Sequence, residues 1–409
     1  MSAELLTFGC RLNTYETEVM RGLAAGLSDT LIVNTCAVTA EAERQARQAI
    51  RRAARQRPGV KIVVTGCAAQ RDPAAWRALP GVSRVLGNAD KLRPEHWTAD
   101  AGDAVSDVMT APAAPAPPVA EFAGRSRAFV QVQQGCDHRC TFCVIPFGRG
   151  PSRSVPEDAV IAQAQSLVAA GYRELVLTGV DIASYGQDLP GRPPLGRLAQ
   201  RLLARVPELP RLRFSSLDPA AIDEALWTLL AEEPRMMPHL HLSLQSASDL
   251  VLKRMKRRHL AADARAVIAR ARALRPGIAI GADLIAGFPT ETEALFGETL
   301  AFLRDAALPY LHVFPYSERP GTPAARMPAV PVALRRERAA RLREAGQDAA
   351  AAFFAAQHGR RISVLTERDG TGRSEHFAPV RLAAASDPGR VVAARVIATD
   401  AGGLVADAA

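Results

Sequence analysis

The stretch QQGCDHRCTFCVIPFGRG (residues 133–150) places three cysteines on one short loop. Cys136, Cys140 and Cys143 have the spacing C-x3-C-x2-C. Structural zinc sites generally use four protein ligands, so a zinc site here would need a fourth, for example His138. A four-iron cluster normally takes one thiolate per iron, and three cysteines would leave one iron open to a small molecule. The spacing alone is compatible with either metal site.

Strand-like segments recur between about residues 122 and 350, the first of them just before this loop. Including the strand before the loop, they read AFVQVQQG, ELVLTGVD, RLRFSSLD, HLHLSLQS, AIGADLIAGF and YLHVFPYS, with helix-like segments between them. Six such units predict a full or partial parallel barrel, whose active site lies at the carboxyl ends of the strands. Those ends are polar, with Thr178, Asp181, Ser215, Ser216, Ser243, Gln245, Asp283, Tyr316 and Ser317.

The N-terminal region repeats a different unit. AELLTFGC, DTLIVNTC and GVKIVVTGC are apolar strand-like runs that each end in a cysteine and precede a helix-like stretch. This pattern predicts a parallel-sheet α/β domain, in which the carboxyl ends of the strands share one edge. Cys10, Cys36 and Cys67 would then converge there. The alternative is that they are ordinary buried core thiols, because free cysteine is often buried.

Composition marks the boundaries between these regions. A proline-rich and alanine-rich segment reads as a stiff linker, and alternating apolar segments near the C-terminus predict a small β domain. We therefore predict an N-terminal domain over 1–107, a linker over 108–121, a barrel domain over 122–356 and a C-terminal β domain over 357–409.

Charge and hydropathy suggest a kind of binding partner and a cellular compartment for the protein. The formal charge of +9 and the pI near 9.7 favour a polyanionic partner such as nucleic acid. Residues 43–57 place Arg44, Arg47, Arg51 and Arg55 on one helix face, which is either a basic binding stripe or a solvated surface. The sequence shows neither a membrane-spanning run nor a signal peptide, so we expect a cytoplasmic protein whose six cysteines do not form three disulfides.

The cysteine loop, with Phe142 before its last cysteine and a βα barrel around it, resembles that of the radical S-adenosylmethionine (SAM) enzymes. The resemblance implies that Cys136, Cys140 and Cys143 hold a [4Fe-4S] cluster whose open iron chelates SAM. An electron from the cluster then cleaves SAM to a 5′-deoxyadenosyl radical. The cofactor supplies the difficult chemistry, and the protein orients it and excludes water.

The whole chain resembles the methylthiotransferases within that group. TFGC, VNTCAVT and VTGCAAQ precede the barrel, and TGVDIASYG, LSLQSASDLVLKRMKR, DLIAGFPTET and FPYSERPGTPA match later motifs. The resemblance implies a second [4Fe-4S] cluster on Cys10, Cys36 and Cys67, and two SAM molecules, one as methyl donor and one as radical source. It also implies a C-terminal TRAM-like domain that binds RNA. The implied SAM-binding residues are Phe142, Thr178, Gly179, Ser243 and Gln245, of which the last four are otherwise ordinary polar residues of a barrel mouth.

The stretch TFGCRLNTYETE (residues 7–18) points to one branch of that family. It resembles the branch that modifies N6-threonylcarbamoyladenosine beside the tRNA anticodon, whereas other branches act on isopentenyladenosine in tRNA or on a ribosomal-protein aspartate. We therefore expect a tRNA anticodon stem-loop and SAM as partners, together with an electron donor and a sulfur source that the sequence does not identify. An alternative of another class is an iron–sulfur or zinc protein that binds RNA without catalysis.

Overall fold

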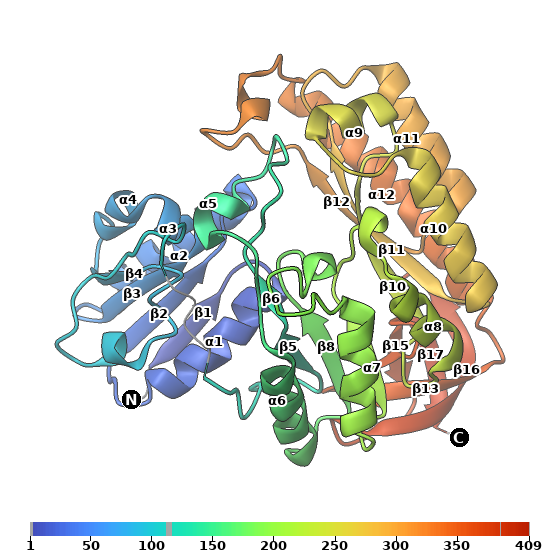
Figure 1. The fold of residues 1–409 in the computed structure, drawn as a ribbon, viewed down its shortest axis with the longest axis horizontal. Coiled ribbons are helices and arrows are strands. Elements are labelled where there is room, and N and C mark those ends of the chain that lie inside the picture. Colours follow the sequence, from blue (N-terminus) through green and yellow to red (C-terminus); the bar gives the residue numbers. More distant parts are fainter. Residues whose placement is uncertain (1–2, 112–116, 385, 409) are drawn as a thin grey trace.

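The protein is described by a computed structural model that covers residues 3–111, 117–384 and 386–408. Part of the expected linker, residues 112–116, lies outside the described residues. Figure 1 shows an N-terminal α/β domain on one side of a central barrel-like domain, with a small β domain against the barrel's other end. Within the described ranges, no helix is both long and apolar enough to cross a membrane.

The N-terminal domain is a parallel four-stranded sheet in the order β1-β2-β3-β4. Every residue of β2, and every residue of β3 after Lys61, is buried because both faces of this sheet are covered. The predicted strands are present, and the sequence interpretation missed the fourth. The elements are β1 (Glu4–Thr7), α1 (Arg11–Leu23), β2 (Thr30–Thr35), α2 (Ala40–Gln56), β3 (Lys61–Gly66), α3 (Cys67–Arg71), α4 (Pro73–Arg77), β4 (Val82–Leu86) and η1 (Pro94–Trp97).

The central domain is a partial barrel of two parallel three-stranded sheets, β5-β8-β9 and β10-β11-β12. Isolated parallel bridges, including Leu217 with Leu242, join the two sheets, and α1 of the N-terminal domain packs beside β5. Its strands and 3-10 segments are β5 (Ala128–Gln131), β6 (Gln133–Gln134), β7 (Arg153–Ser154), β8 (Glu174–Thr178), η2 (Ile182–Ser184), β9 (Arg211–Phe214), η3 (Pro219–Ala221), β10 (His239–Gln245), β11 (Ala279–Ala286), β12 (Tyr310–Pro315) and η4 (Pro323–Arg326). Its helices are α5 (Ile145–Arg149), α6 (Glu157–Ala169), α7 (Leu195–Arg205), α8 (Glu224–Glu232), α9 (Asp249–Met255), α10 (Ala261–Leu274), α11 (Glu293–Ala306) and α12 (Val332–Ala355).

The C-terminal domain is a closed barrel in the order β13-β14-β15-β17-β16. It presents Phe377 to the amino-terminal ends of the central strands, where the ring lies 5.1 Å from that of His239 at the start of β10. Arg127 and Arg213 lie over the same ring, at 5.1 and 5.0 Å from its centroid. This domain therefore covers the end of the barrel opposite the cysteine loop. Its strands are β13 (Arg361–Thr366), β14 (Thr371–Ser374), β15 (Pro379–Leu382), β16 (Val391–Asp400) and β17 (Gly403–Ala408).

Candidate active site

The first cysteine trio lies at the carboxyl edge of the N-terminal sheet. Cys10 caps α1, Cys36 follows β2, and Cys67 begins α3 directly after β3. Asn13 holds the first two loops together, because its amide donates hydrogen bonds to Phe8 O at 2.8 Å and to Thr35 O at 3.0 Å. The predicted convergence is therefore present in the fold.

A glycine allows two of these cysteines to approach closely. Gly9 has φ of +103°, and a Cβ added to it would lie 2.6 Å from Cys36 Cβ. Burial, together with the nearby Cys67 and Cys10, raises the pKa of Cys36 to about 12. Buried thiols of this kind do not ionise readily at neutral pH, whereas a bound metal deprotonates its thiol ligands. The trio is therefore suited to holding metal rather than to acting as a free nucleophile.

Buried positive charge lies beside this trio. Arg149, on α5 of the barrel domain, donates to both carboxylate oxygens of Glu16, at 2.7 and 2.9 Å, and to Asn13 Oδ1 at 2.6 Å. Lys91 Nζ lies 2.6 Å from Glu16 Oε2. Burial alone would lower the pKa of Arg149, but Cys67 and Glu16 hold it well above its usual range. Two cations thus face one carboxylate, and Arg149 partly offsets the rise that burial causes in the pKa of Cys10.

The second trio lies on a tightly anchored loop after β6. Cys136 N donates to Gly150 O at 3.1 Å, and Thr141 Oγ1 donates to Arg254 O at the end of α9 at 2.7 Å. Gly135 has φ of +73°, and a Cβ there would lie 1.8 Å from the carbonyl oxygen of Pro151. The loop consequently requires glycine at this position.

Donor groups aim at the sulfur atoms of this loop. Ile145 N donates to Cys143 Sγ at 3.5 Å, and Arg257 Nη1 lies 3.8 Å from Cys140 Sγ. Burial raises the pKa of Cys143 to about 11 and that of Cys136 to about 12. As at the first trio, metal binding would hold these thiols ionised, and hydrogen bonds to sulfur would stabilise the thiolates.

The ligand atoms available near each trio bear on which metal it could hold. Within the described part of the chain, the only three His, Cys, Asp or Glu ligand atoms within 4.8 Å of one another belong to His241, Asp283 and His312. A tetrahedral zinc ion with bonds of about 2.3 Å would hold its sulfur ligands roughly 3.8 Å apart. In neither cysteine trio do all three sulfur atoms lie within 4.8 Å of one another. His138, the candidate fourth zinc ligand, instead pairs with Asp181 at 2.9 Å.

The two trios face one another across the boundary between the domains. Cys67 is among the groups that act electrostatically on Cys143. A Cβ added to Gly148 on α5 would lie 3.4 Å from Cys67 Cβ. The helix that follows the second trio thus packs directly against the first, so that groups bound at the two sites would be neighbours.

The predicted SAM-contact residues occupy the carboxyl ends of the strands. Thr178 ends β8, and a Cβ on the following Gly179 would lie 2.5 Å from Gln133 O. Gln245 ends β10 with φ of +67°, and Ser243 precedes it on the same strand. Phe142 packs edge-on against Phe288, with 6.4 Å between ring centroids. All five therefore lie at the barrel mouth or on its cysteine loop.

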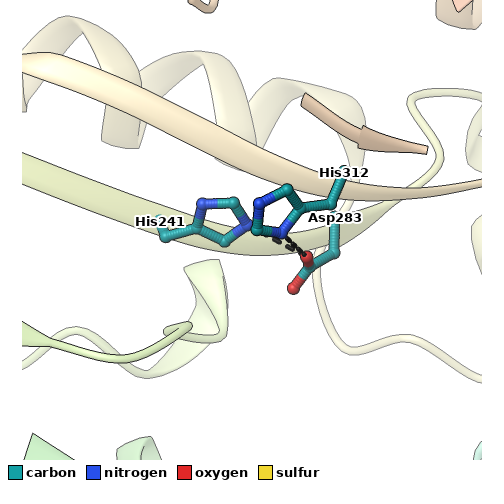
Figure 2. A group of neighbouring side chains, drawn as sticks. All are labelled: His241, Asp283 and His312. Carbon is teal, nitrogen blue, oxygen red and sulfur yellow. Dashed lines mark hydrogen bonds and ion pairs between the residues drawn. The ribbon is translucent and has the colours of Figure 1, made fainter. Parts of the chain in front are cut away.

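A polar cluster lies on three neighbouring strands. Figure 2 shows His241 of β10 and His312 of β12 converging on Asp283 of β11, at 3.0 and 3.1 Å from the same oxygen, Asp283 Oδ1. Burial alone would raise the pKa of Asp283, but the two imidazoles hold it well below its usual range. Two histidines and a carboxylate can ligate a transition metal. Here, however, the cation Arg11 acts on both His241 and Asp283, which opposes the binding of another cation.

Comparison with known proteins places the chain in a family. Residues 130–303 match the radical SAM superfamily, and residues 3–87 match the family described as uncharacterized protein family UPF0004. The threonylcarbamoyladenosine tRNA methylthiotransferase MtaB of Rickettsia prowazekii is 47% identical over 98% of this chain and 96% of its own length. The Bacillus subtilis protein of the same name is 40% identical, over 78% of this chain and 74% of its own length.

The chain belongs to the radical SAM methylthiotransferases. Other branches of the family are also similar, including the ribosomal protein uS12 methylthiotransferase RimO of Desulforudis audaxviator, at 37% identity over 96% of this chain and 93% of its own length. Among solved structures, the radical SAM methyltransferase TsrM of Kitasatospora setae matches with a TM-score of 0.54 and 17% identity, covering 77% of this chain and 69% of that chain. This last match supports the fold alone.

As a radical SAM methylthiotransferase, the enzyme uses SAM and [4Fe-4S] clusters, and the two open cysteine trios fit two such groups. The sequence interpretation found these cysteines but missed the charged residues around them, namely Glu16, Lys91, Arg149 and Arg257. One usable signal was the position of Arg149 in FGRG, only six residues after Cys143.

Proposed function

We propose that this methylthiotransferase acts on tRNA and converts N6-threonylcarbamoyladenosine next to the anticodon to its 2-methylthio derivative. The observation that carries the proposal is the meeting of the two cysteine trios, which brings a SAM-cleaving site and a second cluster site to one boundary. The substrate is supported by the name of the relative from Rickettsia prowazekii, which matches 98% of the chain at 47% identity.

Within this proposal, Cys136, Cys140 and Cys143 hold the cluster that binds SAM, and Cys10, Cys36 and Cys67 hold the second cluster. One SAM molecule would supply the methyl group, and a second would supply the radical that begins the replacement of an adenine C–H by C–SCH3. Phe142, Thr178, Gly179, Ser243 and Gln245 form the SAM pocket.

Charged side chains of this protein lie beside both cysteine trios. Arg257 bridges Cys140 and Asp218, with its Nη2 3.1 Å from Asp218 Oδ2, and so fixes one thiolate in place. Arg149 and Lys91 offset negative charge at the first trio. The C-terminal domain covers the end of the barrel opposite the cysteine loop, which limits access of water to the reacting groups.

The net charge of +9 and the closed C-terminal barrel support binding of the tRNA anticodon stem-loop. The basic helix face divides in two: Arg44, Arg51 and Arg55 are exposed, whereas Arg47 packs over the ring of Trp76 at 4.2 Å. The exposed part is available to phosphates. A substrate in tRNA places the reaction in the cytoplasm, with an electron donor and a sulfur source still to be identified.

Mass spectrometry of tRNA nucleosides from a deletion strain tests the substrate. We expect the methylthio form of threonylcarbamoyladenosine to disappear and its unthiolated precursor to accumulate, and we expect the intact gene to restore it. A strain carrying the Cys143→Ala variant should remain deficient. Loss of methylthio-isopentenyladenosine, or of the modified ribosomal aspartate, with threonylcarbamoyladenosine unaffected, would contradict the proposal.

A further inference from the structure

The fourth strand of the N-terminal sheet ends at the same edge as the three strands that carry the first cysteine trio. β1, β2 and β3 are each followed by a cysteine of the trio. β4 pairs in parallel with β3, and Asn88 follows shortly after this strand ends at Leu86. Because the carboxyl ends of parallel strands share one edge, this edge receives an amide beside three thiols. The Asn88 side chain is buried there, with 6% of the residue exposed.

The Asn88 amide joins the first trio to the helix that follows the second trio. Its Nδ2 donates a hydrogen bond to Cys67 Sγ at 3.6 Å and another to the carbonyl oxygen of Gly148 on α5. An amide nitrogen carries two N–H groups, so these two contacts use both of them. Among the residues that the structure describes, no other side chain donates to a sulfur atom of the first trio.

The atoms around this amide determine its orientation. A flipped amide would place its oxygen against Gly148 O and the Cys67 sulfur, and both of these accept hydrogen bonds when the thiol is ionised. In the observed orientation, Asn88 Oδ1 is buried and has no hydrogen-bond partner in the described part of the chain. An unsatisfied buried acceptor is unfavourable, whereas a leucine of similar shape would avoid this cost. Stability alone therefore does not account for an asparagine at this position.

The backbone around Asn88 is held by contacts that do not involve its side chain. Asn88 N donates to Gln70 Oε1 at 2.7 Å, and Gln70 lies on α3, the helix that Cys67 begins. In the same loop, the carboxylate of Asp90 accepts hydrogen bonds from Ser106 N at 2.7 Å and from Ser106 Oγ at 2.6 Å. The stability of this loop can therefore be altered without removing the donor to sulfur.

Hydrogen bonds to cysteine sulfur change how readily an iron–sulfur cluster accepts an electron. An N–H group stabilises a thiolate ligand, and this effect is greater when the cluster gains an electron and becomes more negative. The reduction potential of the cluster therefore rises with each such donor. The same hydrogen bond limits the rotation of the ligand's side chain, as hydrogen-bonded partners of metal ligands do at other sites.

We propose that Asn88 is a positioning residue, whose amide orients Cys67 and raises the reduction potential of the first cluster. This inference rests on the proposed assignment of Cys10, Cys36 and Cys67 as the ligands of that cluster. The hydrogen bond to Gly148 O ties the same amide to α5 of the barrel domain, so the orientation of Cys67 also depends on the packing of the two domains.

A redox titration of a full-length chain that keeps only the first cluster tests this role. Cys143→Ala provides this background, because it removes a ligand of the second cluster. Asn88→Leu is added to it, which keeps a similar shape and removes both N–H donors. Electron paramagnetic resonance follows the reduced cluster as the potential is varied. We expect Asn88→Leu to disfavour the reduced form about 10-fold, which corresponds to about 59 mV for one electron.

Two further variants in the same background separate the hydrogen bond from a general loss of structure. Ser106→Ala is the matched control, because it removes the hydroxyl that anchors the same loop to Asp90 and leaves every donor to sulfur in place. Its potential should equal that of the background. Asn88→Ala removes the same donors as Asn88→Leu without a branched side chain, and should lower the potential in the same direction. Iron analysis reports whether each variant still holds the cluster.

An unchanged potential in iron-loaded Asn88→Leu would overturn the role of Asn88. If Asn88→Leu binds no iron, Asn88→Ala decides in the same way. Loss of iron from both Asn88 variants, with full iron in Ser106→Ala, would support the positioning of Cys67. Equal loss of iron in Ser106→Ala would assign the effect to the loop and overturn the proposal.

Failure of the proposed function has a different signature. If the first trio holds no cluster, Cys143→Ala alone would bind no iron, which would refute the ligand assignment and this inference together. An error in the proposed substrate would appear only in the nucleosides of the deletion strain. The shift in potential between Asn88→Leu and its background would then still be present.

Discussion

Arg149 donates hydrogen bonds to both carboxylate oxygens of Glu16, at 2.7 and 2.9 Å, although the two residues belong to different domains. Both side chains are buried. Glu16 lies on the helix that begins after Cys10, and Arg149 ends the helix that follows Cys143. This pair therefore fixes the two cysteine-bearing loops relative to each other.

Arg149→Met should destabilise the boundary between the domains. The substitution removes both hydrogen bonds from Arg149 to Glu16 and leaves Lys91 as a cation on that carboxylate, so we expect a cost of about 2 to 3 kcal/mol. Arg44→Met removes an exposed pair with Glu41 instead and should cost much less. Urea unfolding of both variants measures the difference, and equal midpoints would show that the Glu16 pair does not hold the domains together.

Cys10→Ala should remove the first cluster alone. We expect about four iron atoms fewer per chain than in the wild-type protein. Cleavage of SAM should continue, because Cys136, Cys140 and Cys143 are unchanged. Iron analysis and 5′-deoxyadenosine assays provide the readouts, with Cys143→Ala as the reverse case that loses SAM cleavage. Full iron content in Cys10→Ala would refute the assignment of Cys10 as a ligand.

Acid should weaken the protein through Glu174. Burial alone would raise the pKa of this carboxyl, but Arg213, Arg127 and Arg211 lower it to about 2 from an ordinary 4.5. A depressed pKa means that the ionised group stabilises the fold fully above about pH 4.5, and that this stability is lost as pH falls toward 2. Glu174→Gln should therefore be destabilised at pH 7, with the gap from wild type narrowing below pH 4.5.

Thermal melts between pH 7 and pH 3 measure this dependence. Glu224→Gln is the matched control, because Glu224 pairs with Arg270 at the exposed surface. Its melting temperature should follow that of the wild type across the range. A gap for Glu174→Gln that stays constant with pH would contradict the linkage.

Binding to tRNA should depend strongly on salt. Each neutralised phosphate releases counterions, so six or more contacts would reduce affinity by about 10³ or more between 50 and 200 mM salt. Arg51→Gln and Arg55→Gln on the exposed face of α2 should each make the slope less steep if that face binds phosphates. Salt-insensitive binding would argue against a tRNA substrate.

The sequence predicted the parts of the site that depend on local order. Cys10, Cys36 and Cys67 each follow a strand, and parallel strands bring such residues to one edge whatever lies between them. The strands β4, β14 and β17 were missed, and β4, for example, reads VSRVL, which shows little alternation of apolar and polar residues. Glu16, Lys91 and Arg149 could not be matched in advance, because pairs separated by 75 and 133 positions depend on the packing of whole domains.

The contact of Phe377 with His239, Arg127 and Arg213 attaches the C-terminal domain to the end of the barrel opposite the cysteine loop. The C-terminal domain therefore closes this end of the barrel. Arg211 donates a hydrogen bond to Ser363 Oγ at 2.8 Å, so hydrogen bonding as well as stacking holds the C-terminal domain against the barrel. Without this domain, the buried side chains of Arg211 and Arg213 would be exposed to water at this end of the barrel. Deletion of the C-terminal domain should therefore allow SAM to be cleaved without formation of product. It should also weaken the binding of tRNA.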